Sequence, residues 1–182
     1  MLQALRTAVA DPAQVSDRAI DRHATAYDAS HFLLIPQAVV TAANANEVGA
    51  LMRASAAQGV PLTLRSGGTS LSGQAVSDGV LVDVRKNFRV IEVLDDSGSR
   101  VRVRPGATVR AINARLLRYG RRLGPDPASE VACTIGGVIA NNSSGMNCGT
   151  TENTYRTLES MTLVLPSGTV IDTGAPDADL KL

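Results

Sequence analysis

A strand–helix–strand pattern near the start of the chain constrains the fold more than any other feature. Residues 39–40 form a short apolar run, and Asn44 can cap a helix in which Glu47 is placed to reach back to the first turn. Gly59 is expected to end that helix, and residues 62–64 to form the next strand. A strand–helix–strand connection favours parallel strands, so the pattern predicts a mixed helix and strand domain.

The rest of the chain continues this alternation. The expected elements are a strand at 80–84, a hairpin of strands 90–94 and 101–103, a helix from Thr108 to Gly120, and strands at 161–165 and 170–171. Residues 1–26 are polar and alanine-rich, which predicts a peripheral lead-in. Residues 174–182 form a polar tail that we expect to stop without a closing element, like a cut end.

The composition narrows the functional class. Among 182 residues, 18 Lys and Arg balance 17 Asp and Glu, and a net charge of +1 disfavours a nucleic-acid partner or a polybasic membrane patch. No apolar run approaches the length of a membrane span, and no secretory signal is evident. Two cysteines make no disulfide framework. We therefore expect a cytoplasmic protein, with peripheral association with a membrane left open.

Two loops could carry chemistry, at residues 65–74 and 134–145. Both combine glycines, which let a ligand approach the backbone, with Ser, Thr or Asn side chains that form hydrogen bonds. Successive backbone N–H groups in such loops form a concave anion site, and a diphosphate is its natural guest. Either loop alone is weak evidence, because Gly-Gly pairs also mark plain turns.

Other nucleotide-binding and metal-binding motifs are excluded because residues that they require are missing. Gly68 and Gly73 have the spacing of a phosphate-binding P-loop, but Gln74 and Ala75 stand where that motif needs Lys and Ser or Thr. Neither loop has the glycine spacing of a nicotinamide dinucleotide fold. The remaining candidates are expected to be ordinary surface or core residues, with no metal site: His23, His31, Cys133, Cys148 and the arginines at 115, 118 and 122.

Several segments stand out in order along the chain: Tyr27-Asp28-Ala29-Ser30, 36–40, 61–74, 124–127, 134–137 and 141–145. Together, in this order, these blocks resemble the N-terminal half of FAD-linked oxidases of the vanillyl-alcohol oxidase and p-cresol methylhydroxylase (PCMH) type. The similar branch is the D-2-hydroxy acid dehydrogenases, which act on D-lactate, glycolate or D-2-hydroxyglutarate. Residues 143 and 154–156 are similar to large bacterial members that have an added iron–sulfur region.

The resemblance implies an α+β, PCMH-type FAD-binding fold, with two α/β subdomains and the cofactor between them. Residues 1–26 are the lead-in, and 27–182 are the N-terminal part of the FAD-binding domain, truncated at its C-terminus and without the substrate domain. An iron–sulfur cluster is expected, if at all, only in that missing region.

The resemblance also implies that backbone amides of residues 65–70 wrap the FAD pyrophosphate, and that residues 125–134 approach the flavin and ribityl chain. The second loop is implied to allow close backbone approach at its glycines and to continue the polar lining. The strand near 170–171 is expected to flank the adenine. Covalent members of the family carry His where Thr69 stands, so non-covalent FAD is implied. The implied cofactor-binding residues are Arg65, Ser66, Gly67, Gly68, Thr69, Ser70, Gln74, Pro125, Ser129, Thr134, Gly136, Gly137, Asn141, Ser143, Ser144 and Gly145.

The implied activity is oxidation of a D-2-hydroxy acid to the 2-oxo acid, with hydride transfer to flavin N5. The family's catalytic base lies in the substrate domain, so we expect no catalytic residue and no metal within 1–182, and an inactive fragment. The partners are FAD, a small 2-hydroxy acid and an unspecified electron acceptor. Two alternatives stay open: an FAD-fold module with a non-redox or binding-only role, and a nucleotide-binding protein of unrelated chemistry.

Overall fold

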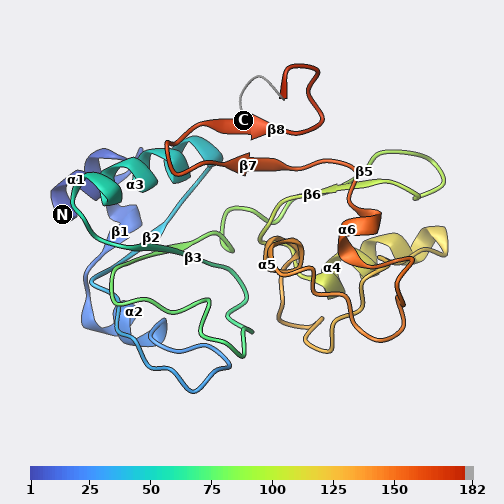
Figure 1. Cartoon of the computed structure of the whole chain (residues 1–182), viewed down its shortest axis with the longest axis horizontal. Coiled ribbons are helices and arrows are strands. Elements are labelled where there is room, and N and C mark those ends of the chain that lie inside the picture. Colours follow the sequence, from blue (N-terminus) through green and yellow to red (C-terminus); the bar gives the residue numbers. More distant parts are fainter. Residues whose placement is uncertain (179–182) are drawn as a thin grey trace. The chain divides into compact units, whose positions relative to one another are not determined.

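The computed structural model describes residues 1–178 and divides the chain into two compact units (Figure 1). The first unit comprises Met1–Arg65, Ser70–Asp83 and the segment from Glu159 onward. The second comprises Ser66–Thr69 and Val84–Leu158. Both units mix helices and strands, which confirms the predicted fold class.

The first unit contains a four-stranded sheet in the order β1-β2-β4-β3. Strands β2 (Ala38–Thr41), β3 (Leu62–Arg65) and β4 (Val80–Asp83) are parallel, and β1 (Val15–Ser16) is antiparallel to β2. The predicted strands β2 and β3 are therefore parallel but not adjacent, because β4 pairs with both. The glycine-rich loop starts at the carboxyl end of β3, the edge of a parallel sheet where ligands bind in open α/β folds.

Helix α3 (Ala45–Ala57) connects β2 to β3 and begins at the predicted cap. Asn44 Oδ1 accepts a hydrogen bond from Glu47 N at 3.0 Å. The side chain of Glu47 reaches one residue further than expected: Oε2 accepts from the backbone N–H of Ala43 at 2.7 Å. Gly59, with φ of +63°, follows the helix as predicted.

The N-terminal segment, expected to be a peripheral lead-in, is partly built into the first unit. It carries α1 (Leu2–Thr7), a 3-10 turn at Pro12–Gln14, β1 and α2 (Ala19–Ala24). Leu5 is fully buried, and Val15 pairs with Val40. The sequence did not reveal this, because a two-residue strand has no periodicity of its own and forms only against its partner.

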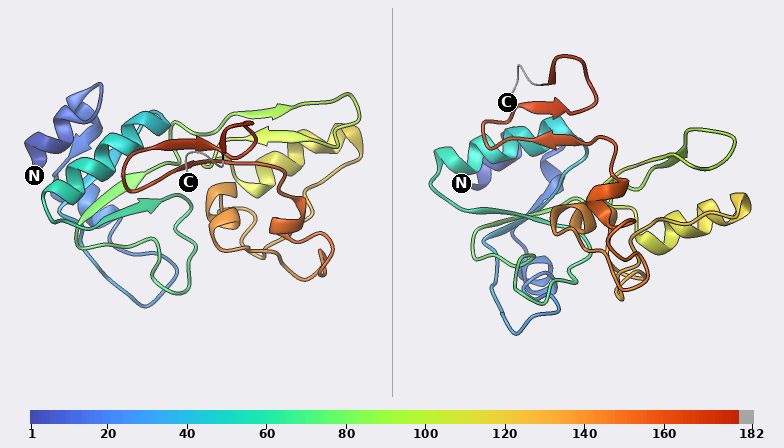
Figure 2. Two further views of the ribbon diagram at one scale, coloured as in Figure 1. Left: turned by 45° about the horizontal axis from the view of Figure 1, so that its top comes forward. Right: turned by 45° about the vertical axis from the view of Figure 1, so that its right-hand side comes forward.

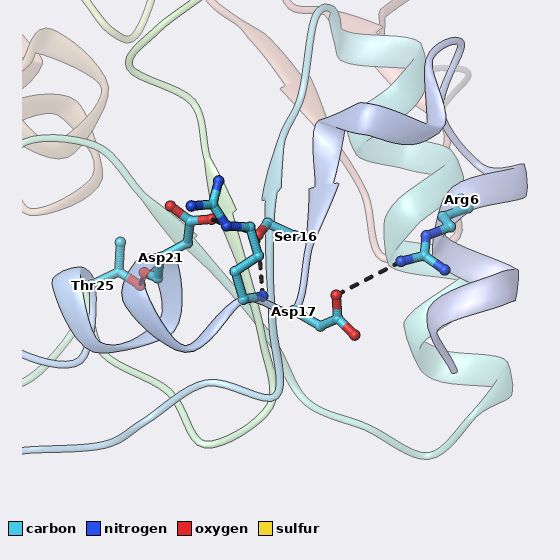
Figure 3. A network of polar contacts seen from close by, with 6 residues as sticks. Arg6, Ser16, Asp17, Asp21 and Thr25 are labelled. Carbon is cyan, nitrogen blue, oxygen red and sulfur yellow. Dashed lines mark hydrogen bonds and ion pairs between the residues drawn. The ribbon is translucent and has the colours of Figure 1, made fainter.

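Polar contacts fix this segment locally (Figure 3). Arg6 Nη2 lies 3.7 Å from Asp17 Oδ1, and Ser16 Oγ donates to Asp21 Oδ2 at 2.6 Å. Thr25 Oγ1 donates to the carbonyl oxygen of Asp21 at 2.9 Å. Asp21 thus joins the end of β1 to α2.

A C-terminal hairpin completes the first unit. Strands β7 (Thr162–Val164) and β8 (Val170–Asp172) are antiparallel and pack on α3. The fit is close, since a Cβ on Gly49 would lie 2.7 Å from the carbonyl oxygen of Gly168. Residues 179–182 of the expected polar tail lie outside the described residues.

The second unit is built on a hairpin and a helix. Strands β5 (Ile91–Val93) and β6 (Val101–Val103) pair as predicted, and α4 (Val109–Leu116) packs on them (Figure 2). The predicted cap is confirmed, with Thr108 Oγ1 accepting from Ala111 N at 3.2 Å. A 3-10 turn at Leu117–Tyr119 follows α4, and the remaining helices are α5 (Ile135–Ala140) and α6 (Thr154–Thr157).

The histidines, the outer arginines and the cysteines are surface or core residues, as expected. His23 and His31 are exposed, as are the arginines at 115, 118 and 122, and both cysteines are free and buried. Within residues 1–178 no helix is long and apolar enough to cross a membrane. The same residues contain no group of three or more side chains that could hold a metal ion.

Candidate cofactor site

In the second unit, the front of the first loop lies against the start of the second. The hydroxyl groups of Ser66 and Thr134 are hydrogen-bonded to each other. A Cβ on Gly67 would overlap the carbonyl oxygen of Ala132 and lie 3.0 Å from the Cα of Cys133. The structure therefore brings together two loops that stand more than 60 residues apart in the chain.

Three consecutive backbone amides in this loop are available to a ligand. Among residues 1–178, the N–H groups of Gly67, Gly68 and Thr69 have no hydrogen-bond acceptor. Gly68 has φ of +67°, a left-handed conformation that side chains disfavour. Successive free amides of this kind suit an anion such as a diphosphate.

The second loop is not the irregular segment that its glycines predicted. Residues 135–140 form α5, whose Ile135 and Val138 are buried in the core of the second unit. The prediction was wrong because it gave the Gly-Gly pair more weight than these apolar residues at helical spacing. The N–H groups of Ile135 and Gly136 donate to the carbonyls of Ala107 and Pro105, at 2.8 and 3.0 Å.

The two glycines of α5 have different surroundings. A Cβ on Gly136 would lie 2.6 Å from Pro105 Cβ, so the protein itself requires that glycine. A Cβ on Gly137 would meet nothing within 4 Å. Glycine inside a helix is destabilising compared with alanine, so packing gives no reason for glycine at 137. Close approach of a ligand does give one.

Replacing Gly137 with alanine is therefore expected to separate stability from cofactor binding. The free energy of unfolding should rise by about 0.5–1 kcal/mol, because alanine has the higher helix propensity. The affinity for FAD should fall, because the methyl group occupies the approach that we assign to the cofactor. Denaturant unfolding and FAD titration measure the two quantities. Equal or stronger FAD binding would remove Gly137 from the site.

The remaining second-loop residues mainly shape the backbone around Asp126. The N–H of Asp126 donates to the carbonyl oxygen of Ser144 at 2.6 Å, and Gly145, with φ of +94°, forms a bridge with Asp126. Thr154 Oγ1 donates to Ser143 O at 2.9 Å. The structure places the following candidate residues in the second unit: Ser66, Gly67, Gly68, Thr69, Pro125, Ser129, Thr134, Gly136, Gly137, Asn141, Ser143, Ser144 and Gly145.

Three other candidate residues belong to the first unit: Arg65, Ser70 and Gln74. Arg65 Nη1 donates to the carbonyl oxygens of Ala75 and Thr25, at 2.9 and 3.4 Å. Ser70 Oγ donates to Gln74 Oε1 at 3.0 Å and accepts from the N–H of Gln74 at 3.3 Å. Arg65 thus joins the loop to Thr25, whereas Ser70 and Gln74 bond to each other within the loop.

A hollow of about 350 Å³ lies beside Gly67 within the second unit. Its lining includes two basic residues that the sequence analysis missed, Arg85 and Arg89. Their signal was a pair of arginines four residues apart just after a strand, which is uninformative until the fold brings them next to Gly67. Two guanidinium groups match the charge of a diphosphate. The other lining residues are Ile91, Gly106, Ala107, Thr108, Ala111, Val131 and Ala132.

Cys133, which backs Gly67, is a packing residue. Burial raises the pKa of its thiol, outweighing the hydrogen bond from Ser129. A protonated, buried thiol is a poor nucleophile. The site therefore contributes hydrogen-bond donors and charge rather than a reactive side chain.

Comparison with known families identifies the fold. Residues 36–174 match the family model described as FAD binding domain. The chain belongs to this family. FAD is thus the cofactor of this domain, and the free amides of residues 67–69 with the two arginines of the adjacent hollow fit a dinucleotide diphosphate.

Curated relatives and a solved structure confirm the predicted branch and fold. The FAD binding domain is 36% identical over 115 residues to glycolate oxidase subunit GlcD of Escherichia coli K12, covering 62% of the chain and 23% of that protein. It is 32% identical over 159 residues to D-lactate dehydrogenase of Archaeoglobus fulgidus, covering 81% of the chain and 34% of that protein. The structure of substrate-bound p-cresol methylhydroxylase superposes with a TM-score of 0.75 at 17% identity, covering 98% of the chain and 37% of that protein. The chain thus spans about a third or less of the length of these two curated relatives.

Proposed function

We propose that this chain is the FAD-binding part of a flavoenzyme that oxidises a D-2-hydroxy acid, of the D-lactate kind, to the 2-oxo acid. The observation that carries the proposal is the run of three free amides at residues 67–69, held against Ala132–Thr134 in an FAD binding domain. The names of the relatives, glycolate oxidase subunit and D-lactate dehydrogenase, support the substrate class.

The residues of this chain bind and orient the cofactor. The amides of Gly67, Gly68 and Thr69 donate to the diphosphate, and Arg85 and Arg89 offset its negative charge. When bound, FAD would supply flavin N5 as the hydride acceptor for oxidation at the substrate Cα, which also requires a base for the hydroxyl proton. We assign that base and the substrate contacts to polypeptide outside residues 1–182.

We further propose that the FAD is dissociable. Thr69 stands where covalent relatives carry the attacking imidazole, and a threonine hydroxyl does not replace that nucleophile. The binding role of the individual side chains, the domain boundary at residue 27 and a cytoplasmic location stay predictions.

Two measurements test the proposal. The purified chain is mixed with FAD, desalted and examined for the visible absorption of bound flavin, and acid precipitation should then release that flavin into the supernatant. FMN, which lacks the AMP half, is the control ligand and should be retained less. A chain that is colourless after saturation with FAD and desalting would contradict cofactor binding. Flavin that stays in the acid pellet would contradict dissociable FAD.

The substrate is tested with the natural polypeptide that contains this sequence, loaded with FAD and kept free of oxygen. D-Lactate, glycolate and D-2-hydroxyglutarate are added separately, with L-lactate as the control. At least one of the three is expected to bleach the flavin, which needs no added electron acceptor. Bound flavin that none of them bleaches would leave a binding-only role and refute the proposed oxidation.

A further inference from the structure

A short segment of the first unit, residues 26–34, lies against the back of the glycine loop. We call this segment the brace. The N–H of Leu34 donates to the carbonyl oxygen of Ala26 at 2.9 Å, and Tyr27 forms a bridge with Leu33, so the brace closes on itself. It contains the block Tyr27-Asp28-Ala29-Ser30, to which neither the resemblance nor the cofactor site gives a role.

Asp28 connects the brace to the end of the loop. Its Oδ1 accepts from the N–H of Ser30 at 2.8 Å, and its Oδ2 accepts from the N–H of Ala75 at 3.2 Å. The carbonyl oxygen of Ala75 accepts from Arg65 Nη1 at 2.9 Å. Both polar backbone groups of Ala75 are therefore held, and Arg65 ties the first residue of the loop to the residue that follows the loop.

A second contact sits two residues earlier in the chain. Gly73 has φ of +75°, and a Cβ there would lie 2.5 Å from Cδ2 of the Phe32 ring. The aromatic ring of the brace thus fits against the bare backbone of the loop. Side chains of the brace hold the loop at Gly73 and at Ala75, while the ligand-facing amides lie at 67–69.

The carboxylate of Asp28 has the charge and the two acceptor oxygens needed to hold both Ser30 and Ala75. Partial burial raises its pKa, but hydrogen bonds from Ser30 and Ala75 and the nearby charge of Arg65 together lower it below the ordinary value. The group is therefore ionised at neutral pH and presents two acceptor oxygens, whereas an asparagine amide would present one.

We propose that Asp28 is a positioning residue for FAD binding, which acts through Ala75 to hold the loop in the conformation that presents its amides to the diphosphate. Asp28 touches no cofactor in this scheme. The inference rests on the proposed function, since it assumes that the loop binds the diphosphate. A purely structural aspartate would change stability without a selective change in FAD affinity.

The test compares Asp28→Asn with Asp21→Asn. Asp21 is a matched control, because it belongs to the same unit, is also half-buried, and accepts a side-chain hydrogen bond from Ser16 away from the loop. Asp28→Asn is expected to raise the Kd for FAD about tenfold, by loss of one charge-assisted hydrogen bond that orders the site. Hydrogen exchange of the amides in residues 66–75 should also speed up in the FAD-free chain. Asp21→Asn should change neither quantity.

The outcomes separate the two proposals. Suppose that the wild-type chain retains FAD and that Asp28→Asn changes neither the Kd for FAD nor the hydrogen exchange of residues 66–75. That result overturns the proposed role of Asp28 and leaves the proposed function standing. A wild-type chain that does not retain FAD overturns the proposed function and this inference together. Should Asp28→Asn fail to fold, Asp28→Glu carries the test. It keeps both oxygens but displaces them by one methylene from Ala75, and an unchanged Kd for FAD in that variant overturns the proposal.

Discussion

Replacing Gly67 with alanine is expected to abolish retention of FAD. The added methyl group would overlap the carbonyl oxygen of Ala132 and press on the Cα of Cys133. Both neighbours are backbone, and Cys133 is fixed because its N–H donates to Ser129 O at 2.8 Å and its carbonyl accepts from Val109 N at 3.3 Å. The loop must therefore move instead, which breaks the Ser66–Thr134 hydrogen bond and displaces the amides of residues 67–69.

The effect should appear in both stability and binding. Overpacking of this kind costs about 1–3 kcal/mol of unfolding free energy, measurable by urea titration. Quenching of FAD fluorescence should show a loss of affinity beyond about tenfold, since several hydrogen bonds are misplaced together.

Gly79→Ala is the matched control. A Cβ there would also overlap a backbone carbonyl, that of Pro61, but at the amino ends of β3 and β4. It should lower stability by a similar amount while the folded fraction binds FAD normally. Undiminished FAD affinity in Gly67→Ala would show that the front of the loop is not part of the site.

Local signals in the sequence predicted the elements that local interactions form. Asn44 and Thr108 cap the helices that they were expected to cap, since the acceptor and donor lie three residues apart. The hairpin of β5 and β6 follows from its turn residues, where Asp95 Oδ1 accepts from the N–H groups of Ser97 and Ser99, both at 3.0 Å. Only the order of blocks along the chain could identify the family, because neither glycine loop is specific alone.

Features that depend on distant partners were not predictable. The position of β4 between β2 and β3 is decided by pairing across the sheet, and the two-residue strand β1 exists only through Val40 and Val39. Helix α5 is held by burial of Ile135 and Val138 against residues of α4, which a glycine count does not register. The arginines of the hollow and the brace behind the loop were not predictable for the same reason, because their neighbours are distant in the sequence and come close only in the folded chain.

The remaining large effect concerns conformation rather than space: Gly68→Val should also abolish FAD retention. Gly68 has φ of +67°, and a left-handed backbone costs an L-residue about 1–2 kcal/mol, more when the side chain is β-branched. Valine relieves that strain by returning to negative φ, which changes the direction of the neighbouring peptide groups. The amides that we assign to the diphosphate then point in other directions.

Gly120→Val isolates this effect. Gly120 lies in the same unit at φ of +66°, and nothing is within 4 Å of a Cβ placed there. Both variants should therefore unfold at similarly lowered urea concentrations. Only Gly68→Val, however, should lose its flavin during desalting. If both retain flavin, the diphosphate does not depend on the amides next to Gly68. If both lose it, general destabilisation explains the result, and the left-handed turn at Gly68 has no special part in holding FAD.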